Sequence, residues 1–157
     1  MSIPVRGMYF EEFEVGQEYQ TGARTITEAD IVNFAGLSGD FNFIHMNAEA
    51  SKDTPFGQRV AHGMLVASIA TGLAVQQGFI DGTTLAFREL SWKFTKPVFI
   101  GDTIHVQIKI IETKAMPRLG GGIVGFEARV VNQHEDVVHK GDWRMLIKSR
   151  SNQAFPA

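Results

Sequence analysis

The sequence predicts an α+β fold in which an antiparallel sheet wraps round one long central helix. Two observations lead to this prediction. The residues between Arg59 and Asp81 carry no charge and would surround a helix with apolar side chains on nearly all sides, which is typical of a buried helix. The chain that follows alternates apolar and polar residues in several runs, which is the pattern of strands with one buried face. Packing the sheet on the helix would bury both apolar surfaces.

The N-terminal half is predicted to be largely irregular, with one short helix. Residues 1–25 form an N-terminal segment with a short strand near residues 17–24. Thr27 and Asp30 have the spacing of a capping box, in which a hydroxyl and an acidic side chain bond to the free amides of a helix start. We expect Gly36 and Gly39 to end that helix and residues 38–58 to be irregular.

The long helix and the strands complete the predicted domain. The helix is expected to begin at His62 and to end near Gly78. The strand-like runs have short connections, which favour antiparallel pairing, and they cover about residues 90–95, 104–110, 124–130 and 137–147. A sheet wrapped round a helix in this way is called the hot dog fold. We expect a single domain over residues 1–157, with a C-terminal tail from about residue 150.

Composition excludes several classes of protein. Of the 157 residues, 44% are hydrophobic and 20% are charged, which excludes intrinsic disorder. The net charge of −2 gives no general attraction to nucleic acid or to an anionic membrane, so we expect neither as a partner. The absence of cysteine excludes a disulfide scaffold, a thiolate nucleophile and an iron–sulfur cluster. Polar residues interrupt the uncharged stretch, which argues against a membrane span, and the lack of an apolar leader predicts a cytoplasmic location.

The first candidate for chemistry is the loop that contains Asp40, Asn42 and His45. It places a carboxylate, an amide and an imidazole within six residues, after a glycine that stops the preceding helix. Asp and His can act as an acid and base near neutral pH, and a water held between them could be activated for addition. The alternative is structural, because Asp40 and Asn42 are also the residues that stabilise turns.

The second candidate is the helix start at Ala61-His62-Gly63. Free amides at a helix N-terminus favour developing negative charge, and Gly63 would let a ligand carbonyl approach its N–H closely. That is the layout of an oxyanion hole; the alternative is that Gly63 only permits tight packing. His45 and His62 do not have the spacing of a compact zinc site, so no metal is expected. His105, His134 and His139 are assigned solvent-exposed or structural roles.

These two segments together resemble a known family. Asp40-x-Asn42-x-x-His45, followed by residues 56–65 with the helix-opening His62-Gly63, is similar to the hydratase 2 motif of MaoC-like (R)-specific enoyl-CoA hydratases. The resemblance is detailed from about Thr27 to Gly78. The strand pattern as far as about residue 149 agrees with the hot dog fold of that family.

The resemblance implies reversible hydration of a trans-2-enoyl-CoA to an (R)-3-hydroxyacyl-CoA in fatty acid metabolism. Asp40 and His45 would hold the catalytic water, Asn42 would fix the loop, and the Gly63 amide would bind the thioester oxygen. No metal or redox cofactor is implied, because the thioester itself acidifies the α carbon, and coenzyme A enters as part of the substrate. The acyl-CoA thioester is thus the expected partner, together with a second copy of the chain in a homodimer or higher homo-oligomer.

Some positions and activities stay open at this stage. His62, Ser68 and Phe43 are candidates to line the site; Phe43 stands where many members of the family carry proline, which puts the acyl preference in doubt. Arg59, Arg88, Lys93 and Lys96 are candidates to meet the phosphates of coenzyme A. Two alternative functions remain: a hot dog thioesterase, disfavoured because residues 60–80 contain no Asp or Glu, and a non-catalytic subunit that binds acyl thioesters.

Overall fold

The computed structural model describes residues 6–150. Residues 1–5 of the expected N-terminal segment and residues 151–157 of the expected tail lie outside the described residues. The helices and strands are η1 Phe10–Glu12, β1 Glu18–Gln20, β2 Arg24–Thr25, α1 Glu28–Ser38, α2 Phe43–Met46, α3 Ala48–Ser51, α4 Gly63–Gln76, β3 Thr84–Phe94, β4 Thr103–Met116, η2 Pro117–Leu119, β5 Gly121–Val131 and β6 Val137–Lys148.

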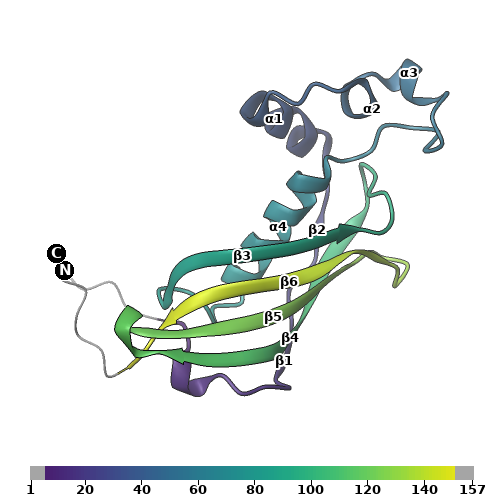
Figure 1. Cartoon of the computed structure of the whole chain (residues 1–157). Helices are drawn as coiled ribbons and strands as arrows, with labels where there is room; N and C mark the ends of the chain where they lie inside the picture. The colour runs from purple at the N-terminus through teal and green to yellow at the C-terminus, as the bar shows by residue number, and fades with distance from the viewer. Residues whose placement is uncertain (1–5, 151–157) are drawn as a thin grey trace.

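The fold is the predicted α+β arrangement, a six-stranded antiparallel sheet with one main helix. The strand order is β1-β4-β5-β6-β3, and β2 also pairs with β4. Figure 1 shows the curved sheet with α4 lying along one face. The four long strands β3 to β6 pair antiparallel throughout. Buried and more exposed positions alternate along the first half of β4 as predicted, whereas β5 is mostly buried and β3 has no buried residue. The hot dog fold is therefore confirmed.

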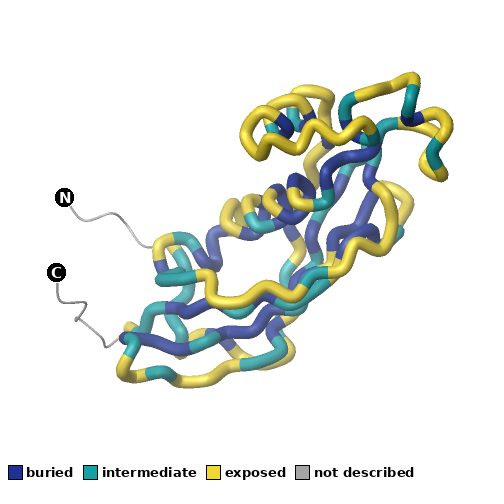
Figure 2. The backbone as a smooth tube through the Cα atoms, turned by 45° about the horizontal axis from the view of Figure 1, so that its top comes forward, coloured by how far each residue is buried: buried dark blue, intermediate teal, exposed yellow. Residues whose placement is uncertain are grey.

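The core lies between α4 and the concave face of the sheet. Val66, Ala70 and Ala74 on α4 are fully buried, as are Val106 and Phe126 on the strands. The prediction that α4 is covered on most sides is wrong, because its opposite side is open to solvent and Figure 2 shows exposed and buried positions alternating along it. Within residues 6–150, no helix has the length and apolar character needed to cross a membrane.

The N-terminal half differs from the prediction in detail. The capping box is confirmed: the Thr27 hydroxyl accepts from the Asp30 amide and Asp30 accepts from the Thr27 amide. Gly36 lies inside α1 and does not end it, whereas Gly39 adopts a left-handed conformation (φ 76°) directly after the last turn. The expected short strand is two strands, β1 and β2. Two four-residue helices, α2 and α3, lie in the stretch expected to be irregular.

Segments α1 to α3 extend beyond the sheet at the N-terminal end of α4. Figure 1 shows them as an overhang above the sheet edge, and Figure 2 shows that most of their backbone positions are exposed. The overhang is attached by main-chain bonds, since Val60 donates to the Ile44 carbonyl and Ala61 to the Val98 carbonyl. It therefore holds the Asp40–His45 loop against the start of α4.

Candidate active site

The loop from Asp40 to His45 is shaped by its own side chains. The main-chain N–H of Asn42 donates to Asp40 Oδ1 (3.2 Å). The side-chain Oδ1 of Asn42 accepts from the main-chain N–H of Ile44 (3.3 Å) and so caps α2. Asp40 and Asn42 thus form the turns that were the structural alternative. The same turns leave the second carboxylate oxygen of Asp40 facing His45, so a structural role does not exclude a chemical one.

His45 is held in one orientation and one tautomer. Its Nδ1 lies 2.7 Å from the main-chain oxygen of Val60. A carbonyl only accepts, so Nδ1 carries the hydrogen and Nε2 keeps its lone pair. That Nε2 lies 3.9 Å from Asp40 Oδ2, too far for a direct hydrogen bond. The pair is therefore a base and a carboxylate with a gap between them.

The environment of His45 favours its neutral form. The residue is buried, and this loss of solvation lowers its pKa from the ordinary value of about 6.5. The bond to Val60 and the charge of Asp40 oppose the shift, while the neighbouring His62 adds to it. At neutral pH the imidazole is thus available to take a proton.

His62 packs directly against this pair. Its ring stacks on that of His45 with centroids 3.8 Å apart, and its Nε2 donates to the main-chain oxygen of Asp40 at 2.9 Å. His62 is 2% exposed, and its Nδ1 has no hydrogen-bond partner within the described residues. His62 therefore stacks on His45 and bonds to Asp40, and so fixes both members of the pair.

Gly63 begins α4 next to the pair and is closely covered. As the first residue of the helix it has no intrahelical partner for its N–H, and the helix dipole favours negative charge there. A Cβ at Gly63 would lie 2.6 Å from the ring of Phe94. A side chain at this position would displace the Phe94 ring, so glycine permits the observed packing and leaves the amide without a side chain of its own.

A cavity of about 730 Å³ opens in front of these groups. Asp40, His62 and Gly63 form part of its wall, and most of the remaining wall is apolar. The other lining residues come from α1, the segment between α3 and α4, α4 itself, the end of β3 with the loop after it, and β6: Phe34, Ser38, Phe56, Val60, Ala61, Met64, Phe94, Thr95, Lys96, Pro97, Val98 and His139. A mostly apolar cavity with a few polar groups at one end is the usual form of a small-molecule site.

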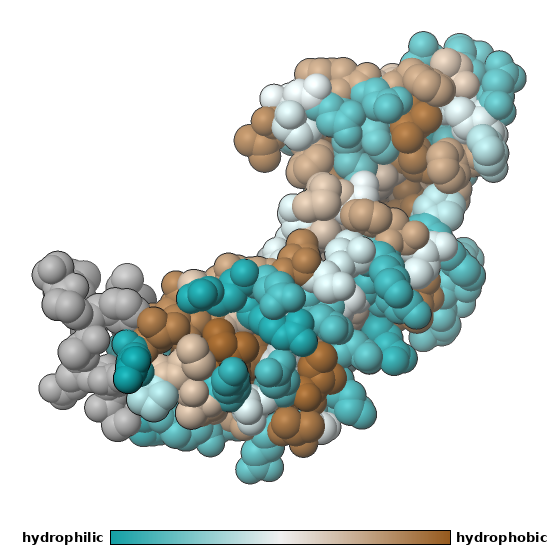
Figure 3. Space-filling view, viewed as in Figure 1, coloured by the Kyte–Doolittle hydropathy of each residue, from teal (hydrophilic) through white to brown (hydrophobic). Residues whose placement is uncertain are grey.

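Apolar residues also reach the surface near this cavity. Figure 3 shows apolar patches on the overhang and over the sheet on the same side of the molecule. Phe56, Met64 and Phe94 line the cavity and are 40 to 55% exposed. The cavity is therefore open to solvent, and the surface around its opening is partly apolar.

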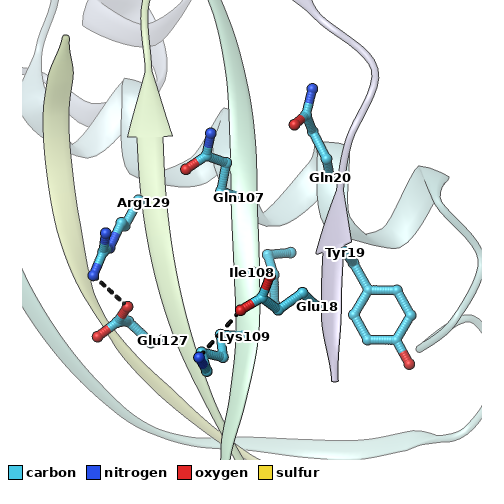
Figure 4. Close-up of a pocket in the computed structure, with 8 residues that line it drawn as sticks. All are labelled: Glu18, Tyr19, Gln20, Gln107, Ile108, Lys109, Glu127 and Arg129. Atoms are coloured by element: carbon cyan, nitrogen blue, oxygen red, sulfur yellow. Dashed lines mark ion pairs between the residues drawn. The ribbon is translucent and has the colours of Figure 1, made fainter. Parts of the chain in front are cut away.

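A second depression, on the outer face of the sheet, has a different character. Figure 4 shows Gln107, Lys109, Glu127 and Arg129 pointing outward from β4 and β5 beside β1. Its charges are paired, Lys109 with Glu18 at 3.1 Å and Arg129 with Glu127 at 2.9 Å. Mutually neutralised, exposed charges of this kind are ordinary surface, and the apolar cavity remains the candidate site.

Several predicted site residues lie apart from the cavity. Phe43 begins α2 with its side chain half exposed and does not line the cavity. Ser68 also lies outside the lining and donates its hydroxyl to the Met64 carbonyl of its own helix. Asn42 and His45 do not line the cavity either, so Asp40, His62 and Gly63 are the predicted site residues in its wall.

The basic candidates are mostly engaged elsewhere. Arg59 donates to both carboxylate oxygens of Glu28 (2.8 and 3.0 Å), and its Nε donates to the His45 carbonyl (2.6 Å). These bonds hold the His45 turn against α1. Lys96 lines the cavity but pairs with Asp136 at 2.5 Å. Arg88 and Lys93 line depressions on the outer face of the sheet.

Sequence reasoning missed His139 and Phe94 as cavity residues. His139 was assigned a solvent-exposed or structural role, yet it is buried and lines the cavity. A signal was present, because His139 has the same parity along β6 as Trp143 and Met145, which face the core. Phe94 likewise continues the parity of Trp92 at the end of β3.

One arrangement of these side chains also suits a cation. Asp40, His45 and His62 each offer a ligand atom, and the three atoms lie within 4.8 Å of one another. A cation and a bound water would use the same lone pairs of these side chains, so they would occupy the same position. These three residues are the ones that would hold a divalent ion if one bound.

Comparison with known proteins connects this chain to one family. Residues 11–132 match the MaoC like domain. The chain is 44% identical over 100 residues to Protein MaoC of Klebsiella aerogenes, covering 64% of this chain and 30% of that protein. It is 40% identical over 102 residues to the (R)-specific enoyl-CoA hydratase of Rhodospirillum rubrum, covering 65% of this chain and 69% of that enzyme. The chain thus spans under a third of the length of the first relative.

Solved structures agree with the fold. A monoamine oxidase regulatory protein from Archaeoglobus fulgidus superposes with a TM-score of 0.85 at 35% identity, covering 91% of this chain and 95% of that one. An (R)-hydratase from Pseudomonas aeruginosa superposes with a TM-score of 0.77 at 28% identity, covering 96% and 95%. Proteins described as regulatory and as hydratases therefore share this architecture.

Proposed function

The chain belongs to the MaoC like domain family, and from that premise we propose that it is a hydro-lyase that adds water reversibly to a trans-2-enoyl thioester. The product would be the (R)-3-hydroxyacyl thioester. One observation carries the proposal: the lone pair of His45 Nε2 faces the Asp40 carboxylate across 3.9 Å, beside the N-terminus of α4. Asp40 lines an apolar cavity that suits an acyl chain, and His45 lies beside that wall, stacked on His62.

The gap between the two groups fits one water. A water about 2.8 Å from each atom, the usual hydrogen-bond length, spans a separation of 3.9 Å. Its oxygen would attack the β carbon while one of its protons passes to His45 Nε2. Asp40 would accept a hydrogen bond from the second O–H and so orient the attacking lone pair.

Charge and proton balance are completed at the thioester. Addition at the β carbon moves an electron pair to the thioester oxygen, giving an enolate that the Gly63 N–H would stabilise. The electron pair returns when the α carbon takes a proton from Asp40, which receives the remaining O–H proton of the new hydroxyl group while His45 returns its proton to that oxygen. One water is consumed and no proton is gained or lost overall. The thioester supplies the acidity of the α carbon, so we propose the reaction without a metal or redox cofactor.

The direct test is an assay with crotonyl-CoA. We expect the ultraviolet absorbance of the conjugated enoyl group to fall in the presence of the protein, and the product to be oxidised by an (R)-specific but not by an (S)-specific 3-hydroxyacyl-CoA dehydrogenase. Prior treatment with a chelator should leave the rate unchanged. A stable enoyl absorbance across a panel of acyl chain lengths, offered on CoA and on acyl-carrier protein, would overturn the proposal.

The thioesterase alternative predicts a different product. Residues 63–76 of α4 carry no Asp or Glu, so that helix supplies no carboxylate to attack or activate water at the carbonyl carbon. Release of free thiol from butyryl-CoA, measured with a thiol reagent, would favour hydrolysis. A non-catalytic subunit would instead bind butyryl-CoA and turn over neither substrate.

We also propose that two copies associate through the free edge of the sheet. Among the described strands, β3 pairs only with β6, which leaves its other edge without a partner. Phe87 and Leu90 on β3 are 43 and 44% exposed. A long apolar edge of this kind is normally covered. Sedimentation should give the mass of a dimer, and Leu90→Asp should shift it toward the monomer.

A further inference from the structure

The wall of the cavity opposite α4 contains a buried histidine that the proposed chemistry does not use. His139 lies on β6, is 3% exposed and lines the cavity together with Phe94. It pairs across the strands with Phe94 and stands edge-on to that ring, with centroids 5.0 Å apart. The Phe94 ring in turn covers Gly63. His139 is thus separated from the proposed oxyanion site by a single aromatic ring.

The tautomer of His139 is set by a tryptophan. Trp92 Nε1 lies 3.4 Å from His139 Nδ1. The indole N–H can only donate, so Nδ1 is the acceptor and the ring hydrogen is on Nε2. The one hydrogen bond that the ring makes within residues 6–150 uses Nδ1, and Nε2 is not one of the fully buried polar atoms that lack a partner, so it retains access to the cavity. His139 therefore holds one unused donor in a cavity whose wall is otherwise mostly apolar.

The surroundings keep this donor uncharged. Burial lowers the pKa of His139 from 6.5 to about 4, so the ring is neutral at physiological pH. Trp92 and Phe94 both stand edge-on to the ring. The charged side chains that line the same cavity are Asp40 and Lys96, and Lys96 is paired with Asp136. A neutral N–H at this position can donate to an uncharged acceptor on a bound ligand.

We propose that His139 is a specificity-determining residue whose Nε2–H donates to an uncharged carbonyl or hydroxyl oxygen of the bound thioester. This rests on the proposed function for the class of ligand. The acceptor has two sources, an amide carbonyl of the pantetheine arm or an oxygen function on the acyl chain beyond the reacting carbons. In either case Trp92 acts as a positioning residue, because it selects the tautomer that leaves Nε2–H available.

The experiment compares three variants on two substrates. His139→Leu removes the donor, His139→Gln keeps an N–H at a similar reach, and His105→Gln is a matched control on β4 outside the cavity lining. The substrates are crotonyl-CoA, whose acyl group has no oxygen beyond the thioester, and an enoyl-CoA with a keto group further along the chain. Loss of one neutral hydrogen bond to a bound ligand should raise KM about three- to tenfold with kcat nearly unchanged.

The outcomes separate the two sources. A rise in KM for both substrates in His139→Leu, restored by His139→Gln, assigns the bond to the pantetheine arm. A rise for the keto substrate alone assigns it to the acyl chain. Equal KM values for His139→Leu, His139→Gln and the wild type on both substrates would overturn the proposal. Trp92→Phe should raise KM in the same direction and by a smaller factor.

Failure here is distinguishable from failure of the proposed reaction. Binding of butyryl-CoA, which has no double bond to hydrate, can be measured by calorimetry without turnover. If the wild type binds it and His139→Leu binds it three- to tenfold more weakly, His139 contacts the pantetheine arm even in a protein that does not hydrate crotonyl-CoA. Unchanged calorimetric affinity together with unchanged KM values on both substrates would show that the Nε2–H donor is not used.

Discussion

The imidazole rings of His45 and His62 are stacked 3.8 Å apart, and His62 also bonds to the main-chain oxygen of Asp40. One buried side chain thus orients both members of the acid–base pair. The His62 ring also contributes to the lowered pKa of His45. We expect contacts of this kind to control the geometry of the acid–base pair.

The first prediction concerns His62→Phe, which keeps an aromatic ring and loses the bond to Asp40. Loss of one neutral hydrogen bond should lower kcat about three- to tenfold. Removing the contribution of His62 should raise the pKa of His45 toward its ordinary value, so the acidic limb of the kcat/KM profile should move to higher pH. Phe34→Leu, which alters another ring against His62 and leaves this bond in place, should not move that limb. An unmoved limb in His62→Phe would contradict the assignment.

The second prediction concerns the pair itself. Asp40→Asn and His45→Gln should each lower kcat by at least about 10²-fold, the usual contribution of a positioned acid or base. The double variant should lose little more than either single variant, because both groups act on one water. Asp53→Asn, an exposed position after α3, is the matched control. Circular dichroism should show all four proteins folded; near-normal turnover by Asp40→Asn would exclude the proposed mechanism.

The third prediction concerns Arg59, which joins α1 to the His45 turn. Arg59→Lys cannot reproduce three directed N–H bonds to Glu28 and to the His45 carbonyl. Leaving these acceptors without their charged donor should lower the free energy of unfolding by about 1–3 kcal/mol in urea titration. Glu28→Gln removes only the ion pair and should cost less. Equal losses in the two variants would show that the bond to His45 contributes nothing.

The fold was more predictable than the site, for a physical reason. Alternation along β4 to β6 is visible in the sequence because each strand has one face in the core. The exposure of Met64 and Val75 on α4 was not visible, because composition shows that a helix is apolar without showing how many of its sides the sheet covers. The helices α2 and α3 are four residues each and depend on capping by Asn42 and Asn47 rather than on periodicity.

Within the site, local contacts were more predictable than distant ones. Asp40 and His45 lie within one turn, so their proximity follows from the local sequence, whereas the stacking of His62 on His45 was not expected from their spacing. His139 is brought to the same cavity by strand pairing with β3, about a hundred residues from Asp40 along the chain. The alternation of side chains along β6 is enough to place the His139 side chain on the core face. Its position beside Phe94 depends on the register between β3 and β6, which the sequence does not show.

The fourth prediction concerns the hairpin glycines at the start of β5, for which the sequence suggested no role. A Cβ on Gly121 would lie 1.9 Å from the Ile147 carbonyl oxygen, and one on Gly122 would lie 2.2 Å from the Phe10 ring. The backbone at Gly121 has to move to accept any side chain, so Gly121→Ala should lower the free energy of unfolding by at least about 1–3 kcal/mol. Gly22→Ala, where a Cβ meets nothing within 4 Å, should be close to neutral.

The last prediction is a pH dependence of stability that arises from His139. In the unfolded chain its pKa is about 6.5, and burial lowers it to about 4 in the folded protein. Between these values the unfolded state binds a proton that the folded state does not, so stability decreases as the pH falls from about 6.5 to 4. The full difference corresponds to about 3 kcal/mol, at about 1.4 kcal/mol for each unit of pKa.

Urea unfolding at pH 7 and pH 4.5 tests this directly. His139→Leu and His139→Gln both lack the titrating ring, so each should lose less stability between the two pH values than the wild type does. Trp92→Phe keeps the buried imidazole and should retain most of the wild-type loss. If His139→Leu lost as much stability on acidification as the wild type, the pKa of His139 would be the same in the folded and unfolded states. The ring would then be protonated in the folded protein at pH 4.5. It could not then be the neutral donor that the cavity requires.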